Sequence, residues 1–261
     1  MAARPLILLS NDDGFRAQGL NELREALATV ADVVVCAPYS EQSGTSHSIS
    51  LTTPLRLREH GPGLFSLDGT PADSVYVALC AIGRVLPRRP DLVVSGLNHG
   101  LNLAADVFYS GTVAAAREGA LRGLRGLALS AGPDADFAGA ARCAVELAQA
   151  FLAEPLPEGG KGILLNVNFP AGDRWPVRAT RLGLRRYEDR AEFRRDPRGG
   201  EYLWLGGSSV VHGEAAGSDT EAYDAGVVGV TPLSLEMWES GQQPLAERIA
   251  QGALRVLPVR P

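Results

Sequence analysis

Short apolar runs that alternate with helical patterns constrain the fold of this 261-residue chain more than any other feature. Residues 6–9, 33–36 and 92–94 read Leu-Ile-Leu-Leu, Val-Val-Val-Cys and Leu-Val-Val, with no polar residue in any of them. A strand buried on both faces has this character, which is typical of parallel sheets covered by helices. Apolar residues then recur at helical spacing over residues 19–30. The pattern predicts an α/β fold with a doubly wound, mostly parallel sheet.

The other segments fit the same alternation of strands and helices. We expect further helices at residues 71–86, 112–121, 137–152 and 245–256, and further strands at residues 127–129, 163–167 and 227–230; the strand that contains residues 33–36 extends over residues 32–37. Residues 38–50 are polar and rich in small residues, so we expect a long loop there. Residues 51–68 alternate around Gly61-Pro62-Gly63, which predicts a hairpin inserted into the α/β scheme.

The composition changes after residue 170. Eight arginines and four acidic residues lie within residues 178–198, and aromatic and aliphatic residues follow at 202–205. This composition predicts a β-rich arm rather than another strand–helix unit. We therefore divide the chain into a core over residues 1–175 and a C-terminal part over residues 176–261, which contains the arm, a returning strand and the terminal helix.

The charged and apolar residues exclude several function classes. The net charge is −5, so the whole protein is not a general binder of polyanions. A P-loop is excluded, because it needs Gly-Lys-Ser/Thr, whereas Lys161 is the only lysine and is followed by Gly162. No apolar run approaches the ~18–20 residues that cross a bilayer, and residues 1–5 lead directly into a predicted strand. We therefore expect neither a membrane partner nor a signal peptide.

The cysteines and histidines also carry information. Cys36, Cys80 and Cys143 are far apart, and each lies in an apolar run. Because disulfides are rare in reducing compartments, we expect buried free thiols and a cytoplasmic location. The four histidines show no spacing typical of zinc ligands, so a zinc site is not expected.

Polar residues follow the first predicted strand, where Asp12 and Asp13 stand side by side before Gly14. In open α/β sheets, ligands bind beyond the carboxyl ends of the strands. Two crowded carboxylates repel each other, and a hard divalent cation relieves that repulsion. A solvated Asp-Gly turn explains the same residues, so their position alone leaves a metal site and a plain turn equally open.

The strand at residues 92–94 ends in a second polar segment, which contains Asn98 and Asn102. An amide oxygen is a good neutral ligand for a hard cation, although asparagine also favours turns that bind nothing. His99, which lies between them, is better explained as a turn or core residue than as a ligand. This segment belongs to the same predicted edge of the sheet as the paired aspartates.

Two more segments reach that edge. Residues 109–112, Tyr-Ser-Gly-Thr, open a predicted helix whose N-terminal N–H groups favour anions, while N-capping by Ser110 or Thr112 is the simpler explanation. A serine hydroxyl in residues 41–46 could complete a metal shell, although a flexible loop is the better explanation of that segment taken alone. Together the strand ends supply carboxylate, amide and anion-binding groups, a combination that suits a phosphate with a divalent metal.

These segments resemble the SurE family, the survival-protein 5′/3′-nucleotidases. The matching motifs are collinear over residues 5–235 and comprise residues 8–14, 43–44, 69–73, 94–102, 109–116, 166–170, 219–220 and 230–233. Each motif is short, but chance agreement of so many in order is implausible. The resemblance implies a Rossmann-like core and a C-terminal β-rich oligomerisation arm within one domain, and therefore a homodimer or homotetramer.

The resemblance also implies an activity and a set of site residues. The activity is that of a 5′-nucleotidase (EC 3.1.3.5), which hydrolyses nucleoside 5′- and 3′-monophosphates with a divalent metal; short polyphosphate is open as a further substrate. One Mg²⁺ or Mn²⁺ ion per subunit suits an oxygen-only shell. The residues implied for the metal are Asp12, Asp13, Ser43 and Asn98, with Asp12, Asp13 and Asn98 catalytic. The phosphate-binding residues are Asn102, Ser110, Gly111 and Thr112.

Three alternatives compete with this interpretation. A haloacid-dehalogenase-like phosphatase normally uses Asp-x-Asp with a lysine, whereas here the aspartates are adjacent and Lys161 is distant. A nucleotide sensor would bind AMP or GMP in the same pocket without turnover. An RNA-binding protein would use the arginines of residues 178–198, but their interleaved acids favour a solvated or oligomer-forming face, so we expect no stable nucleic-acid partner.

Overall fold

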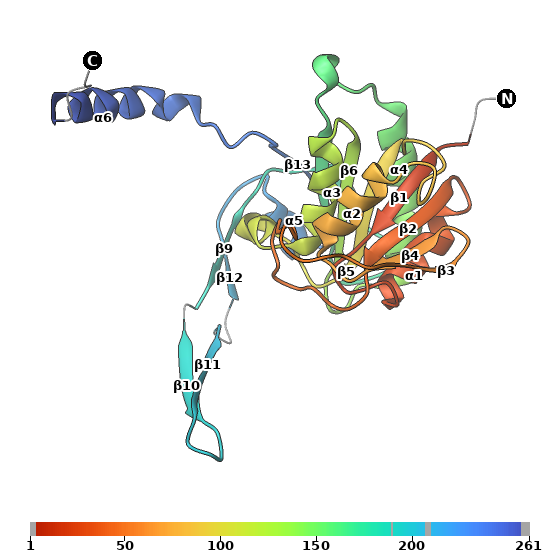
Figure 1. The fold of residues 1–261 in the computed structure, drawn as a ribbon, viewed down its shortest axis with the longest axis horizontal. Helices are drawn as coiled ribbons and strands as arrows, with labels where there is room; N and C mark the ends of the chain where they lie inside the picture. Colours follow the sequence, from red (N-terminus) through yellow and green to blue (C-terminus); the bar gives the residue numbers. More distant parts are fainter. Residues whose placement is uncertain (1–3, 189, 207–209, 257–261) are drawn as a thin grey trace.

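A nine-stranded sheet forms the centre of the molecule (Figure 1). The computed structural model describes residues 4–188, 190–206 and 210–256. The strand order is β3-β4-β2-β1-β5-β6-β7-β13-β8. The strands are β1 (Leu6–Ser10), β2 (Asp32–Pro38), β3 (Leu57–Gly61), β4 (Leu64–Leu67), β5 (Leu92–His99), β6 (Arg125–Ala131), β7 (Ile163–Phe169), β8 (Val177–Ala179) and β13 (Val228–Leu233). Six of them, from β4 to β7, run parallel, which confirms the predicted mostly parallel α/β sheet.

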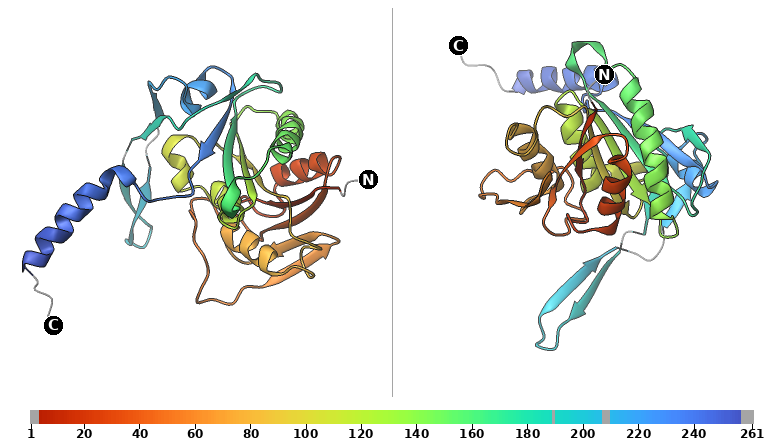
Figure 2. Two further views of the ribbon diagram at one scale, coloured as in Figure 1. Left: turned by 90° about the horizontal axis from the view of Figure 1, so that it is seen from above. Right: turned by 90° about the vertical axis from the view of Figure 1, so that its right-hand side faces the viewer.

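Helices cover both faces of this sheet (Figure 2). They are α1 (Gln18–Leu27), α2 (Pro71–Cys80), α3 (Gly111–Leu121) and α4 (Phe137–Ala153). In β1, Ile7 and Leu9 pack into a cluster with residues of α1 and α4, whereas Leu6 and Leu8 pack into one with residues of α2 and α3. All four side chains are at most 2% exposed. Burial on both faces is therefore the reason that this run is apolar at every position.

Several predicted boundaries shift. The hairpin is confirmed as β3 and β4, and it extends the sheet because β4 pairs in parallel with β2. The helix α2 ends at Cys80 rather than at residue 86, and beyond it Gly83, at a φ of +89°, donates to the carbonyl of Leu86 over 2.7 Å. Strand β5 runs through the polar segment as far as His99, because Asn98 and His99 pair with β6.

The cysteines are all unpaired, as predicted, but not all are buried. Cys36 is fully buried, and this burial raises the pKa of its thiol to about 12. Cys143 is half-buried and Cys80 is exposed. The prediction is wrong for Cys80, the last residue of α2, whose side chain is exposed although Ala78 in the same turn is buried.

The C-terminal part begins within the main sheet and then leaves it. It contributes β8 and β13 to the sheet, with β13 antiparallel to β7. Its other elements are β9 (Leu184–Tyr187), β10 (Ala191–Arg195), β11 (Glu201–Leu205), β12 (Val210–Gly213), α5 (Asp219–Asp224) and α6 (Gln243–Val256). The pair β9–β12 leads to a hairpin of β10 and β11 that projects from the body, as α6 also does (Figure 1). The predicted β-rich arm is confirmed.

Three short 3₁₀ helices complete the described elements: η1 (Ala104–Phe108), η2 (Glu158–Gly160) and η3 (Ser240–Gln242). The first of them lies in the connection between β5 and α3, and it is important for the site. Among the described helices, none has both the length and the apolar character that a membrane span requires.

Candidate active site

The carboxyl end of β1 forms a tight turn that holds the two predicted aspartates. The side chain of Asn11 donates to the carbonyl of Gly14 over 2.9 Å. Gly14 has a φ of +96°, and a Cβ there would lie 3.2 Å from the backbone of Ser40, so glycine suits both the turn and the close approach. The backbone N–H of His99 donates to Oδ2 of Asp13 over 3.1 Å. The structure therefore joins the ends of β1 and β5, as predicted.

Asp12 lies against the first turn of α3. Only 4% of this residue is exposed, and the hydroxyl of Thr112 donates to its Oδ1. A Cβ on Gly111 would lie 2.8 Å from Cβ and 3.0 Å from Oδ2 of Asp12, so the helix backbone approaches the carboxylate as only glycine permits. The positive end of α3 and the paired aspartates thus form one continuous site.

Burial dominates the electrostatics of both carboxyl groups. It raises the pKa of Asp12 to about 6, and repulsion from Asp13 adds to this effect, while the hydrogen bonds from Thr112 oppose it. Burial also raises the pKa of Asp13, with the N–H of His99 opposing it and the charge of Glu41 adding to it. A cation placed against these carboxylates would stabilise their ionised forms.

The other two predicted metal ligands lie on neighbouring elements. Asn98 is 9% exposed, and its Nδ2 donates to the carbonyl of Gly100 over 2.9 Å, which leaves Oδ1 as the atom it can offer to a cation. Ser43 is exposed, and its hydroxyl donates to Oε1 of Glu41 over 3.0 Å rather than to either aspartate. Its loop is nevertheless tied to the site, because the N–H of Gln42 donates to the carbonyl of Asp12 over 2.7 Å.

The predicted metal shell agrees with the chemistry of these donors. All four residues offer oxygen, and two of them are carboxylates whose pKa values are raised by burial, so the set suits a hard divalent cation. No group of three or more His, Cys, Asp or Glu side chains that could hold a metal occurs within the described ranges. A site here therefore depends on the neutral oxygens of Ser43 and Asn98 as well as on Asp12 and Asp13.

The predicted phosphate-binding residues divide into two groups. Ser110 is the N-cap of α3, and its hydroxyl oxygen accepts from the N–H of Val113 over 3.0 Å, while Gly111 and Thr112 form the first turn beside Asp12. Asn102 is 7% exposed, and its Nδ2 donates to Ser130 over 2.8 Å. Its side-chain amide is thus held inside the protein, and phosphate binding by Asn102 stays a prediction.

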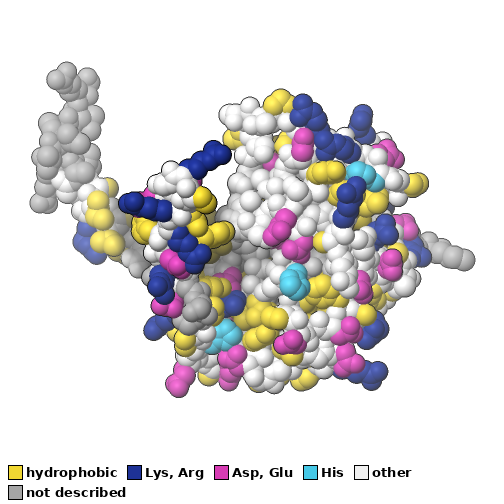
Figure 3. Space-filling model, turned by 90° about the horizontal axis from the view of Figure 1, so that it is seen from below, with side chains coloured by type: hydrophobic (Ala, Val, Ile, Leu, Met, Phe, Trp, Pro, Cys, Tyr) yellow, Lys and Arg dark blue, Asp and Glu magenta, His cyan; other side chains and the backbone are white. Residues whose placement is uncertain are grey.

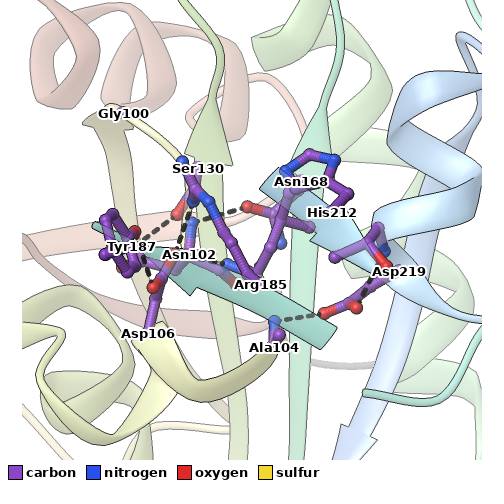
Figure 4. A network of polar contacts seen from close by, with 12 residues as sticks. Gly100, Asn102, Ala104, Asp106, Ser130, Asn168, Arg185, Tyr187, His212 and Asp219 are labelled. Atoms are coloured by element: carbon purple, nitrogen blue, oxygen red, sulfur yellow. Dashed lines mark hydrogen bonds and ion pairs between the residues drawn. The ribbon is translucent and has the colours of Figure 1, made fainter. Parts of the chain in front are cut away.

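A polar network that was not predicted from the sequence supports the connection between β5 and α3 (Figure 4). Tyr187 donates to Oδ1 of Asp106 over 2.7 Å, and Arg185 donates to its Oδ2. Asp219 accepts from the backbone N–H of Ala104 over 2.9 Å. The sequence signals here are the arginine excess of residues 178–198, which does not distinguish Arg185 from the seven other arginines, and the motif at residues 219–220, which contains Asp219.

Comparison with known proteins decides the family. The sequence profile described as Survival protein SurE matches residues 7–189. This chain belongs to the SurE family. A Sorangium cellulosum relative named 5′-nucleotidase SurE is 61% identical over 248 residues, which cover 95% of this chain and 96% of the relative. A Myxococcus xanthus protein of the same name is 46% identical over 242 residues, with 91% and 90% covered.

A solved structure shares the fold of this SurE chain. It is described as the crystal structure of SurE protein from Aquifex aeolicus, and it matches with a TM-score of 0.80 and 35% sequence identity over 94% of this chain and 100% of that chain. Every predicted metal and phosphate residue lies within the span matched by the SurE profile, as do Arg185 and Tyr187, whereas Asp219 lies beyond it.

Proposed function

We propose that this SurE family member is a divalent-metal-dependent 5′-nucleotidase that hydrolyses nucleoside monophosphates to nucleoside and phosphate. The observation that carries the proposal is the contact between the buried carboxylate of Asp12, which stands next to Asp13, and the N-terminus of α3. The relatives named 5′-nucleotidase SurE support the same activity. We extend the proposal to nucleoside 3′-monophosphates and short polyphosphate, which present the same terminal phosphoryl group.

One set of residues would bind the cation, and another would bind the phosphate. Asp12, Asp13, Ser43 and Asn98 would hold one Mg²⁺ or Mn²⁺ ion. The chemistry that the bound ion supplies is polarisation of a phosphoryl oxygen and a lowered pKa for water. The N–H groups of the first turn of α3 stabilise negative charge on the phosphoryl oxygens. A carboxylate of the pair orients the attacking water and accepts its proton.

A phosphate-release assay tests this proposal. The substrates are 5′- and 3′-mononucleotides, p-nitrophenyl phosphate and polyphosphate, each with Mg²⁺, Mn²⁺ or EDTA. We expect release that requires the metal and falls at least 100-fold in Asp12→Asn. Asp32→Asn is the matched control, because the Asp32 side chain is 66% exposed and lies at the start of β2, at the opposite end of the sheet. Binding of AMP without release would indicate a nucleotide sensor instead.

We also propose that the protein forms a homodimer or homotetramer through its C-terminal part. Large apolar side chains are exposed on the projecting hairpin, including Phe193 (62%), Trp204 (63%) and Leu205 (82%). The helix α6 exposes Ile249 (64%). A monomer rarely leaves so much apolar surface open, so these elements are suited to a second copy of the chain.

We infer a cytoplasmic location and no stable nucleic-acid partner. The three free cysteines support a reducing compartment. Figure 3 shows Lys and Arg side chains on the arm and at the rim of this face, with Asp and Glu side chains interspersed among them and across the face. Several arm arginines are also neutralised within the chain, since Arg178, Arg185 and Arg194 form ion pairs with Glu221, Asp106 and Glu192.

A further inference from the structure

Asp106 is held by the base of the arm. It lies in η1, between Asn98 and α3, and both of its carboxylate oxygens accept hydrogen bonds from β9. Arg185 lies 2.5 Å from Oδ2, and the hydroxyl of Tyr187 lies 2.7 Å from Oδ1 (Figure 4). The side chains of the ion pair are only 13% and 11% exposed. Removing one partner would leave a buried charge uncompensated, so this contact is costly to break.

A second contact, from Asp219 at the start of α5, holds the same loop. Ala104 has a φ of +52°, which is uncommon for a residue other than glycine. Its N–H donates to Asp219, whose carboxylate is buried and also accepts from the N–H of Gly183 over 2.7 Å. A backbone in this conformation persists only where its surroundings fix it. The C-terminal part of the chain therefore fixes the loop at two points.

The loop that contains Asp106 is hydrogen-bonded directly to the start of α3. The backbone carbonyl of Asp106 accepts from the N–H of Ser110 over 3.0 Å and from that of Tyr109 over 2.9 Å. Ser110 is the N-cap of α3, and the next two residues face Asp12. One residue, Asp106, thus connects the arm through its side chain to the phosphate end of α3 through its carbonyl.

We propose that Arg185 and Tyr187 are positioning residues for the phosphate-binding end of α3. They fix Asp106, and Asp106 fixes Ser110 and the first turn of the helix relative to Asp12. The inference rests on the proposed function of that turn. It makes the arm a structural component of the active site, so the placement of the arm sets the rate of turnover.

Kinetics of conservative variants test the proposal. Tyr187→Phe removes one hydroxyl from a residue that is 49% exposed, and Arg185→Met removes the guanidinium group while keeping an unbranched side chain about as long as the aliphatic stem of arginine. We expect kcat to fall roughly 3- to 10-fold in the first and roughly 10- to 100-fold in the second, because small displacements of catalytic groups are costly. The half-saturating Mn²⁺ concentration stays unchanged. Arg185→Lys restores part of the loss.

Arg186→Gln is the matched control, because Arg186 is exposed and points to the opposite face of β9. Hydrogen–deuterium exchange of residues 100–112 gives a readout that does not depend on turnover. Faster exchange confined to this loop supports the proposal. Unchanged kcat and exchange in both variants, or an equal loss in Arg186→Gln, would overturn it. An inactive wild-type protein would refute the proposed function, and exchange alone would then decide the role of the two residues.

Discussion

The protonation state of Asp12 that favours folding differs from the one that binds a cation. An aspartate that is buried and has a raised pKa favours its protonated form, whereas binding a cation requires the ionised form. In the unfolded chain the pKa of this group is near 3.8, and in the folded chain it is about 6. Folded protein therefore binds the proton more tightly, and the metal-free protein loses stability as the pH rises from 3.8 through 6.

Asp12→Asn should change the pH dependence of stability, because it removes the group whose pKa differs between the folded and unfolded chains. The difference in pKa corresponds to on the order of 3 kcal/mol. In EDTA, the free energy of unfolding of the variant relative to wild type should therefore increase by roughly 2–3 kcal/mol between pH 4 and pH 7. Urea unfolding at several pH values measures it. A pH-independent difference would contradict the assignment, and Asp32→Asn should show no such trend.

A related outcome concerns the cation. At pH 7, Mn²⁺ should raise the melting temperature of the wild-type protein, because it binds the folded state and stabilises the ionised carboxylates. Asp12→Asn should lose most of that increase. An equal increase in both proteins would place the cation elsewhere.

At the scale of the element, the first turn of α3 is limited by its approach to Asp12. Gly111→Ala would place a Cβ 2.8 Å from Cβ of Asp12 and 3.0 Å from Pro71, so either the helix start or the carboxylate must move. We expect kcat to fall at least 10-fold, measured by phosphate release. Gly119→Ala is the control in the same helix, because its Cβ would meet the side chain of Val93 at 2.5 Å, away from the site. Gly119→Ala should lower the melting temperature but reduce kcat less than Gly111→Ala does. A larger loss of kcat in Gly119→Ala than in Gly111→Ala would contradict this expectation.

Elements with a strong local pattern could be predicted from the sequence. The run at residues 6–9 is buried on both faces, and its composition alone reveals this. Strand β5 could not be predicted to its full length, because Asn98 and His99 extend only by pairing with β6, and their polar side chains indicate a loop. The antiparallel direction of β13 likewise depends on a distant partner, β7, and not on its own residues.

Some residues of the site could also be predicted from the sequence, and others could not. Asp12, Asp13 and Asn98 stand in local motifs, and the topology of a parallel sheet is sufficient to bring them to one edge. The contact of Arg185 with Asp106 joins residues 79 positions apart, and no spacing rule connects them. Ser43 shows a different limit: its motif indicates a ligand, while its hydroxyl is directed toward Glu41.

At the scale of the whole molecule, the arm and α6 extend away from the core while the base of the arm supports the active site (Figures 1 and 4). An assembly that holds the projecting hairpin would also restrain β9 and therefore the loop that carries Asp106. Oligomer formation and turnover are expected to be linked through this contact. The link requires that the exposed apolar residues are covered by another copy of the chain.

The helix α6 offers a direct test of that requirement. Leu245 and Ile249 lie one turn apart on one face and are 45% and 64% exposed, so a charge at this face does not disturb the folding of a single chain. Ile249→Glu should therefore shift the protein to a smaller species in sedimentation velocity at micromolar concentration, since burying an unpaired carboxylate in an interface is costly. Gln251→Glu introduces the same group on another face of the helix and should leave the mass unchanged. A wild-type monomer, or an unaltered oligomer in Ile249→Glu, would show that α6 does not mediate assembly.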